Sequence, residues 1–238
     1  MQRKDVLRTG ASVLGALALS RTSAATGASA AGSGAPPLLG KPVRPPAHGI
    51  VQVAFVIGPE TVMIDVAGPM AAFIDAMDEK MAPAFNTYTV AASTKLVDMG
   101  GLNVQPDHSF ENAPAPHVLV VPQQKHLPET LAYIKAASAR ADVTMSVCNG
   151  AFLLADAGLL DGLYATAHRS AYAAFARKYP KVKLVRGARF VENRDISSSG
   201  GESCGIDLAL RVVERYYGAR RAADSALALE YVRTPRPA

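Results

Sequence analysis

A cysteine that follows a strand-like run and precedes a small-residue segment is the first residue in this sequence that could do chemistry. Cys148 lies in SVCNGAFLLADAGLLDG, directly after the run VTM. A thiol on a strand-to-helix turn would project from a sheet, at a helix N-terminus whose dipole and free N–H groups favour the thiolate. The alternative interpretation is a small apolar side chain that fills the core. The local pattern does not decide between the two.

Two further residues could move protons beside such a thiol. Asp65 follows an apolar run of strand length and precedes VAGP. If partly buried, its carboxyl could stay protonated and act as a general acid, or it could instead cap a helix that begins near Pro69. His168, in ATAHRS, could activate the thiol, although the sequence alone favours a neutral histidine hydrogen-bonded at a strand end.

The first 30 residues have the composition of an export signal. Basic residues at positions 3, 4 and 8 precede the apolar run ASVLGALALS, and small residues end in an A-x-A-like site at positions 28–30. We therefore predict a signal peptide over residues 1–30 and an exported protein, periplasmic or extracellular, with no stable membrane insertion after cleavage. The stretch RKDVLR resembles the twin-arginine (Tat) motif with Lys4 in the second arginine's place. A Sec leader or an uncleaved anchor remains the alternative.

Composition narrows the classes of partner and cofactor. The 238 residues are 49% hydrophobic and 19% charged, which suits one sizeable core. The net charge is +5, and much of it lies in the leader, so we predict no nucleic-acid partner. The histidines share no ligand spacing, and no G-x-G-x-x-G or Walker sequence occurs, so we predict no metal and no cofactor.

In an exported protein Cys148 and Cys204 could form a disulfide, which would block the thiol.

Alternating strands and helices must position these residues. Residues 31–48 are rich in Gly and Pro and predict a linker, followed by a domain over residues 49–238. Apolar runs of strand length (IVQVAFVI, FNTYTVAAS, HVLVVP and VTMSV) alternate with helical patterns, and KLVDMGGLNV predicts a hairpin. The chain ends with a helix up to Gly218 and another over about residues 221–232.

This alternation predicts an α/β fold, a parallel sheet sandwiched by helices with the site at the carboxyl ends of the strands. Cys148, Asp65 and the turn at residues 122–124 each follow such a strand, so they could converge.

In their order along the chain these motifs resemble the DJ-1/PfpI superfamily, which is class I glutamine-amidotransferase-like with a flavodoxin-like fold. The resemblance covers about residues 50–218 and rests on the stretches IDVAGPMAAF, GLNVQPDHSF, HVLVVP, SVCNGAFLLADAGLLDG, ATAHRS and SGGESCGIDLALRVVERYYG. The chain is most similar to the isonitrile hydratase branch, which also provides the N-terminal domain of many AraC-type regulators.

The resemblance implies roles for individual residues. It makes Cys148 the nucleophile on an elbow and Asp65 its partner carboxyl. A small-molecule substrate and a homodimer are implied as well. The supporting residues would be His168, Asn149 and Gly68, and the oxyanion or pocket residues would be Gly150, Gln123, Gln124 and Glu202.

Two departures from the family pattern bear on function. The turn after the third strand is PQQ, where the family usually has PGG, so side chains stand where glycine allows close backbone approach. Asn149 follows the cysteine, where PfpI-type proteases have histidine and hydratase-like members threonine. We therefore expect no peptidase activity. We expect a cysteine-dependent hydratase or hydrolase acting on a small electrophile, and the alternative is a non-catalytic ligand-binding or redox-sensing module.

Overall fold

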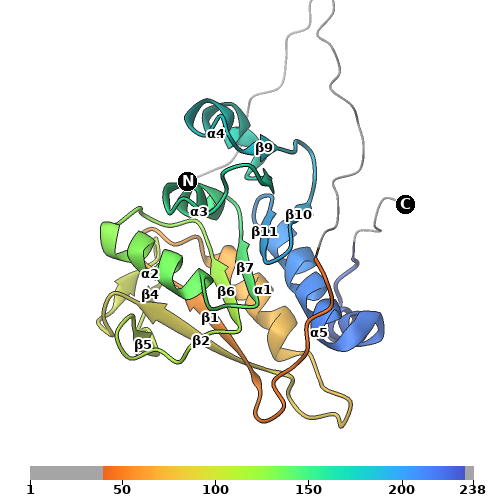
Figure 1. The fold of residues 1–238 in the computed structure, drawn as a ribbon. Helices are drawn as coiled ribbons and strands as arrows, with labels where there is room; N and C mark the ends of the chain where they lie inside the picture. The colour runs from red at the N-terminus through yellow and green to blue at the C-terminus, as the bar shows by residue number, and fades with distance from the viewer. Residues whose placement is uncertain (1–39, 234–238) are drawn as a thin grey trace, which may run out of the picture. The chain divides into compact units, whose positions relative to one another are not determined.

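The structure, a computed structural model, describes residues 40–233. The predicted signal peptide and the first part of the predicted linker therefore lie outside the described residues. A seven-stranded sheet has the order β10-β11-β7-β6-β1-β2-β5, and each neighbouring pair is parallel except β10 with β11. Helices cover both faces of this sheet (Figure 1), so the predicted α/β fold is confirmed.

The strands correspond closely to the predicted apolar runs. Every residue of β6 and β7 is buried, as expected for strands covered on both faces. The short strands β3 and β4 pair antiparallel around Gly100–Gly101, which confirms the predicted hairpin. The strands are β1 Val51–Val56, β2 Phe85–Ala91, β3 Val97–Asp98, β4 Asn103–Val104, β5 His108–Ser109, β6 Val118–Val121, β7 Val143–Ser146, β8 Tyr164–Ala165, β9 Lys183–Leu184, β10 Phe190–Glu192 and β11 Ile196–Ser199.

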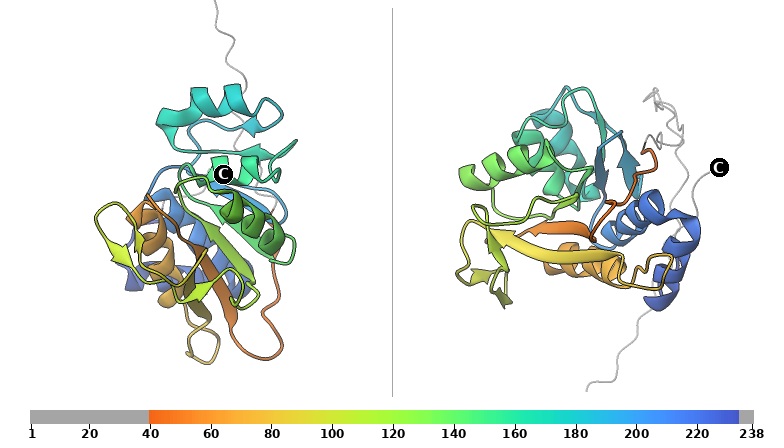
Figure 2. Two further views of the ribbon diagram at one scale, coloured as in Figure 1. Left: turned by 90° about the vertical axis from the view of Figure 1, so that its left-hand side faces the viewer. Right: turned by 60° about the horizontal axis from the view of Figure 1, so that its bottom comes forward.

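Two helical layers enclose the sheet, as Figure 2 shows from two sides. Alternate residues of the strands pack on α1 and α5 in one core cluster and on α2, α3 and α4 in the other. The helices are α1 Met63–Ile74, α2 Pro128–Ser138, α3 Gly150–Asp156, α4 Tyr172–Lys178 and α5 Cys204–Ala228, with a short 3₁₀ helix at Arg169–Ala171. Helix α5 is interrupted at Gly218, which has a φ of 85°, at the position where the sequence predicts one helix to end.

Helix α1 begins earlier than predicted. Its first residue is Met63 and Pro69 lies inside it, so Asp65 is in the first turn rather than at a cap before Pro69. The alternative role of Asp65 as the cap of that helix is therefore wrong. The apolar residues Met63 and Ile64 continue the helical pattern on the N-terminal side of Asp65, which explains the earlier start.

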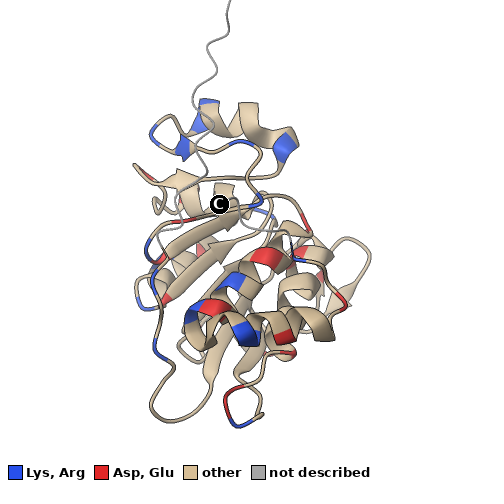
Figure 3. Ribbon diagram, turned by 90° about the vertical axis from the view of Figure 1, so that its right-hand side faces the viewer, with Lys and Arg blue, Asp and Glu red and all other residues tan. Residues whose placement is uncertain are grey.

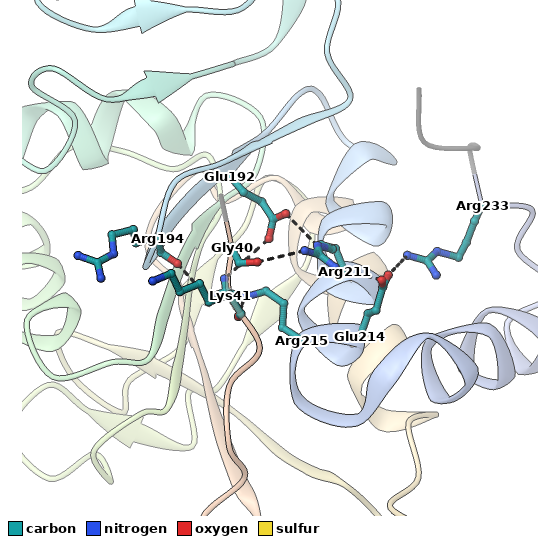
Figure 4. Close-up of polar contacts among 8 residues, drawn as sticks. All are labelled: Gly40, Lys41, Glu192, Arg194, Arg211, Glu214, Arg215 and Arg233. Carbon is teal, nitrogen blue, oxygen red and sulfur yellow. Dashed lines mark hydrogen bonds and ion pairs between the residues drawn. The ribbon is translucent and has the colours of Figure 1, made fainter. Parts of the chain in front are cut away.

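Residues 40–43 of the Gly/Pro-rich segment lie against α5 (Figure 4). Val43 N–H donates to the Arg215 carbonyl at 2.8 Å, and Arg215 Nε donates to the Lys41 carbonyl at 2.8 Å. Glu192, fully buried beneath Gly40, pairs with Arg211 at 2.8 Å and with Arg215 at 3.8 Å. A buried cluster of opposite charges thus holds residues 40–43 against α5.

Acidic and basic residues are interspersed on the face that Figure 3 shows, including along α5. No helix within residues 40–233 is long and apolar enough to cross a membrane.

Candidate active site

Cys148 lies on a tight turn between β7 and α3. Its φ is 58°, a region that residues other than glycine seldom adopt. Two backbone hydrogen bonds fix the turn: Cys148 N–H donates to the Gly200 carbonyl at 2.9 Å, and Val147 N–H donates to the Val121 carbonyl at 3.0 Å. A Cβ at position 150 would lie 2.0 Å from the Val121 oxygen, so Gly150 lets α3 start against β6. This is the geometry of a nucleophile elbow.

The sulfur of Cys148 is almost enclosed by protein, with the residue only 4% exposed. Its S–H donates to Gln123 Oε1 at 3.4 Å, and the backbone N–H groups of Asn149 and Glu202 favour the charged form of the sulfur and so lower its pKa. Burial, and then the charge of Asp65, outweigh these two donors and raise the pKa of the thiol from 9.0 to about 12. The thiolate that the helix N-terminus was expected to favour is therefore not the resting form, because desolvation dominates.

Asp65 is the acidic neighbour of this thiol. It is fully buried, and its Oδ2 accepts a hydrogen bond from the Gln123 backbone N–H at 3.2 Å. Burial raises the pKa of the carboxyl from 3.8 to about 7, and the negative charge of Glu202 adds to the rise, while the Gln123 N–H and, more weakly, the Cys148 thiol oppose it. Oδ1 is buried and has no hydrogen-bond partner, so it is the oxygen that can carry a proton. Asp65 can thus exchange a proton near neutral pH.

The two glutamines of the turn after β6 point in different directions. Gln123 reaches the site, where its Oε1 accepts from the Cys148 thiol and from Asn149 Nδ2 at 2.9 Å. Gln124 turns into the protein instead: its Nε2 donates to the Val56 carbonyl at 2.7 Å, and its Oε1 lies beside Gly58. This corrects the expectation that Gln124 lines the pocket, since its amide supplies a hydrogen bond at the end of β1.

His168 is near the elbow but is not paired with the thiol. Its Nδ1 lies 2.7 Å from Ser170 Oγ and accepts from the Ser170 backbone N–H at 3.3 Å, which caps the 3₁₀ helix. Its ring packs on Gly201, where a Cβ would meet the ring at 2.1 Å. Among the described residues no hydrogen bond joins His168 to Cys148. The arrangement matches the alternative in which this histidine is hydrogen-bonded locally.

Glu202 and Gly68 complete the predicted set. Glu202 has a φ of 50°, and this turn presents its backbone N–H to the sulfur, while its charge raises the pKa values of Cys148 and Asp65. Gly68 serves packing instead of the site, because a Cβ there would lie 2.9 Å from Ile206 of α5. This corrects its assignment as a supporting site residue, since the glycine lets α1 and α5 approach closely.

The two cysteines are both free, so the structure contains no Cys148–Cys204 disulfide. Cys204 Sγ lies 3.2 Å from the position of a Cβ at Gly200, the residue whose carbonyl accepts from Cys148 N–H. Within residues 40–233 no group of three or more His, Cys, Asp or Glu side chains could hold a metal ion.

The contact that sequence reasoning missed is the one between Asn149 and Gln123. These side chains are 26 positions apart and meet directly at 2.9 Å. Both residues departed from the family pattern, and the only signal in the sequence was that the two departures occur together.

The site can therefore offer a thiol on a strained elbow, a buried acid that titrates near neutrality, and two backbone N–H groups directed at the sulfur. Such a set can add a nucleophile to a small electrophile and move one proton. The small exposed fraction of Cys148 restricts direct access to small molecules.

Comparison with known proteins agrees with this geometry. A family model described as the DJ-1/PfpI family matches residues 51–215. An isonitrile hydratase from Pseudomonas putida is 28% identical over 196 residues, which cover 78% of this chain and 80% of that protein. The HTH-type transcriptional regulator GbdR of Pseudomonas aeruginosa is 29% identical over 123 residues, covering 50% of this chain and 33% of the regulator.

A solved structure of a THiJ/PfpI family protein from Pseudomonas syringae superposes with a TM-score of 0.68 at 30% identity, covering 79% of this chain and 77% of that one. The fold, the order of motifs and the family match agree, and the chain therefore belongs to the DJ-1/PfpI family.

Proposed function

We propose that the protein is a cysteine-dependent hydratase or hydrolase that acts on a small electrophile, with isonitriles as the first substrate class to test. The observation that carries this proposal is the pairing of Cys148, on the elbow, with Asp65, whose unpaired Oδ1 can take and return a proton. The similarity to an isonitrile hydratase over most of both chains supports the choice of substrate class.

The first step would form a bond between sulfur and the terminal carbon of the isonitrile. The thiol proton passes to the Asp65 carboxylate as the sulfur attacks, and Asp65 then delivers it to the same carbon, giving a thioimidate on Cys148. Because the pKa of Asp65 is raised to about 7, the carboxylate is a stronger base than an exposed aspartate and still ionises at neutral pH.

The second step would consume one water. Water adds to the thioimidate carbon, the nitrogen gains a proton, and the carbon–sulfur bond breaks to release an N-substituted formamide. The sulfur recovers its proton, so the net reaction is hydration of the isonitrile with no redox change and no cofactor. The backbone N–H groups of Asn149 and Glu202 lie where they can stabilise negative charge at the sulfur as it leaves.

Turnover of a panel of alkyl and aryl isonitriles tests the proposal, with the formamide product measured by mass spectrometry. The Cys148→Ala and Cys148→Ser variants should lose turnover, whereas Cys204→Ala should keep it. Equal turnover by the wild type and Cys148→Ala would overturn the proposal.

A second function is favoured by the burial of the thiol and its raised pKa, and by the match to a transcriptional regulator. In this function the domain would bind a small molecule without converting it. Ligands that raise the melting temperature of the wild type and of Cys148→Ser equally, in the absence of turnover, would support this second function over the first.

The proposed setting is outside the cytoplasm, as a homodimer. This part rests on the basic, apolar and small-residue pattern of residues 1–30 and on the family resemblance. Mass spectrometry of the protein from a secreting host should show a mature N-terminus close to residue 31. A chain that keeps its first 30 residues in the cytoplasm would contradict export, and light scattering would report the oligomeric state.

A further inference from the structure

The side-chain amides of Gln123 and Asn149 meet beside Cys148 in an unbalanced way. Gln123 Oε1 accepts two hydrogen bonds, from the Cys148 thiol at 3.4 Å and from Asn149 Nδ2 at 2.9 Å. The other amide atom of Asn149, Oδ1, is buried and has no hydrogen-bond partner. A buried acceptor without a donor is costly, so the observed arrangement leaves one hydrogen bond unmade.

A second arrangement of the same two amides satisfies that acceptor. The oxygen and the NH₂ of a side-chain amide occupy nearly the same volume, and a half-turn exchanges them. After both amides turn, one hydrogen of Gln123 Nε2 would donate to Asn149 Oδ1, and the other would face the sulfur. The NH₂ of Asn149 would then take the buried position that Oδ1 now occupies. Gln123 would then donate to Cys148 instead of accepting from it.

The two arrangements suit different protonation states of the sulfur. A thiol can donate to Gln123 Oε1, whereas a thiolate can only accept. We propose that Gln123 and Asn149 form a coupled amide switch, which accepts from the Cys148 thiol at rest and turns to donate to the thiolate when the proton leaves. Gln123 is thereby assigned as a residue that contacts the reacting sulfur, and Asn149 as a positioning residue that acts through Gln123.

The proton has a defined destination. It passes from sulfur to the Asp65 carboxylate, whose Oδ1 has no hydrogen-bond partner, so no proton enters or leaves the site. Before the transfer, the charges of Asp65 from α1 and of Glu202 from the loop before α5 both disfavour the thiolate, and after it Asp65 is neutral and only the charge of Glu202 remains of the two. The backbone N–H groups of Asn149 and Glu202 are the existing donors. A third donor from Gln123 would offset part of the effect of this negative charge, which disfavours the Cys148 thiolate.

This inference rests on the proposed function only in taking Cys148 as the reacting group, and it is tested without substrate. The measurement is the rate at which iodoacetamide alkylates Cys148 as a function of pH, in a Cys204→Ala background, with the modified peptide identified by mass spectrometry. Gln123→Met keeps the length of the side chain and removes the amide. Gln123→Glu keeps an acceptor and removes the donor. Gln105→Glu, at an exposed position, makes the same charge change elsewhere.

Gln123→Met should raise the apparent pKa of Cys148 and slow its alkylation at a fixed pH by about ten- to a hundredfold, the effect of losing one hydrogen bond to a charged group. Gln123→Glu should slow it further, because its carboxylate also adds a negative charge beside the sulfur. Gln105→Glu should match the background. Asn149→Leu should have a smaller effect, and adding it to Gln123→Met should change little further, because the two side chains act as one unit. Alkylation of Gln123→Met at or above the background rate would overturn the switch.

If Gln123→Met fails to fold, the neutral Gln123→Leu variant decides the matter, because the carboxylate of Gln123→Glu would raise the thiol pKa by its charge alone. A shifted thiol pKa without isonitrile turnover by the wild type would leave the switch standing and remove the proposed function. Isonitrile turnover by the wild type, together with a Cys148 pKa that does not move in the Gln123 variants, would leave the proposed function standing and remove the switch.

Discussion

The backbone N–H of Gln123 donates to Asp65 Oδ2 at 3.2 Å, and this bond ties the turn after β6 to the first turn of α1. The same residue uses its side chain to hold the Cys148 thiol. One residue of the turn therefore contacts both the Asp65 carboxyl and the Cys148 thiol, which come from segments 83 positions apart in the chain.

Replacing Asp65 with asparagine should reduce turnover by about 10²- to 10⁴-fold, the usual contribution of a positioned proton carrier. The pH profile is the sharper readout. Because the pKa of Asp65 is raised to about 7 and the carboxylate must receive the thiol proton, kcat/KM of the wild type should rise with pH through about 7. The Asp65→Asn variant should lack this rise, and a wild-type rate that falls across the same range would contradict the role.

The free energy of unfolding should also depend on Asp65. Its folded pKa lies above the unfolded value of 3.8, so the folded state holds the proton more tightly, and this stability is lost as pH rises from about 4 to 7. The size expected from a shift of this magnitude is about 4 kcal/mol. Urea unfolding between pH 4 and 8 should show the decline in the wild type and a flatter curve in Asp65→Asn. Identical curves would contradict the raised pKa.

The start of α3 depends on the absence of a side chain at position 150. In Gly150→Ala the new Cβ would lie 2.0 Å from the Val121 oxygen, so β6 and α3 must separate, and we expect a loss of at least about 3 kcal/mol in stability. Gly187→Ala is the control, because its φ is 78° but nothing lies within 4 Å of its Cβ position. It should cost only about 1–2 kcal/mol. Thermal melts that rank the two variants equally would contradict the close approach.

The buried cluster around Glu192 should hold residues 40–44 in place. Glu192→Gln removes the charge shared by Arg211 and Arg215, and we expect a loss of about 3–5 kcal/mol, as for other broken buried ion pairs. Hydrogen exchange should accelerate at the Val43 amide, which donates to the Arg215 carbonyl. Asp161→Asn breaks the exposed pair with Lys181 and should change stability by less than about 1 kcal/mol. Unchanged exchange at Val43 in Glu192→Gln would show that the cluster does not hold this segment.

The sequence by itself determined the succession of strands and helices along the chain and the turn that carries Cys148. Continuous apolar runs predict strands covered on both faces, and the small residues around Cys148 permit the turn, because local sterics act over a few neighbouring residues. The position of Asp65 near the thiol could also be predicted, since the carboxyl ends of parallel strands share one edge of the sheet.

The tertiary structure alone decided the protonation states and the directions of the side chains. Burial, which depends on the whole fold, keeps Cys148 a thiol and brings Asp65 close to half ionisation at neutral pH. The neighbouring residues Gln123 and Gln124 are chemically identical, yet one meets Asn149 and the other binds the Val56 carbonyl. No local pattern distinguishes them, because their partners come from segments distant in the chain, and the backbone of the turn sends consecutive side chains to different sides.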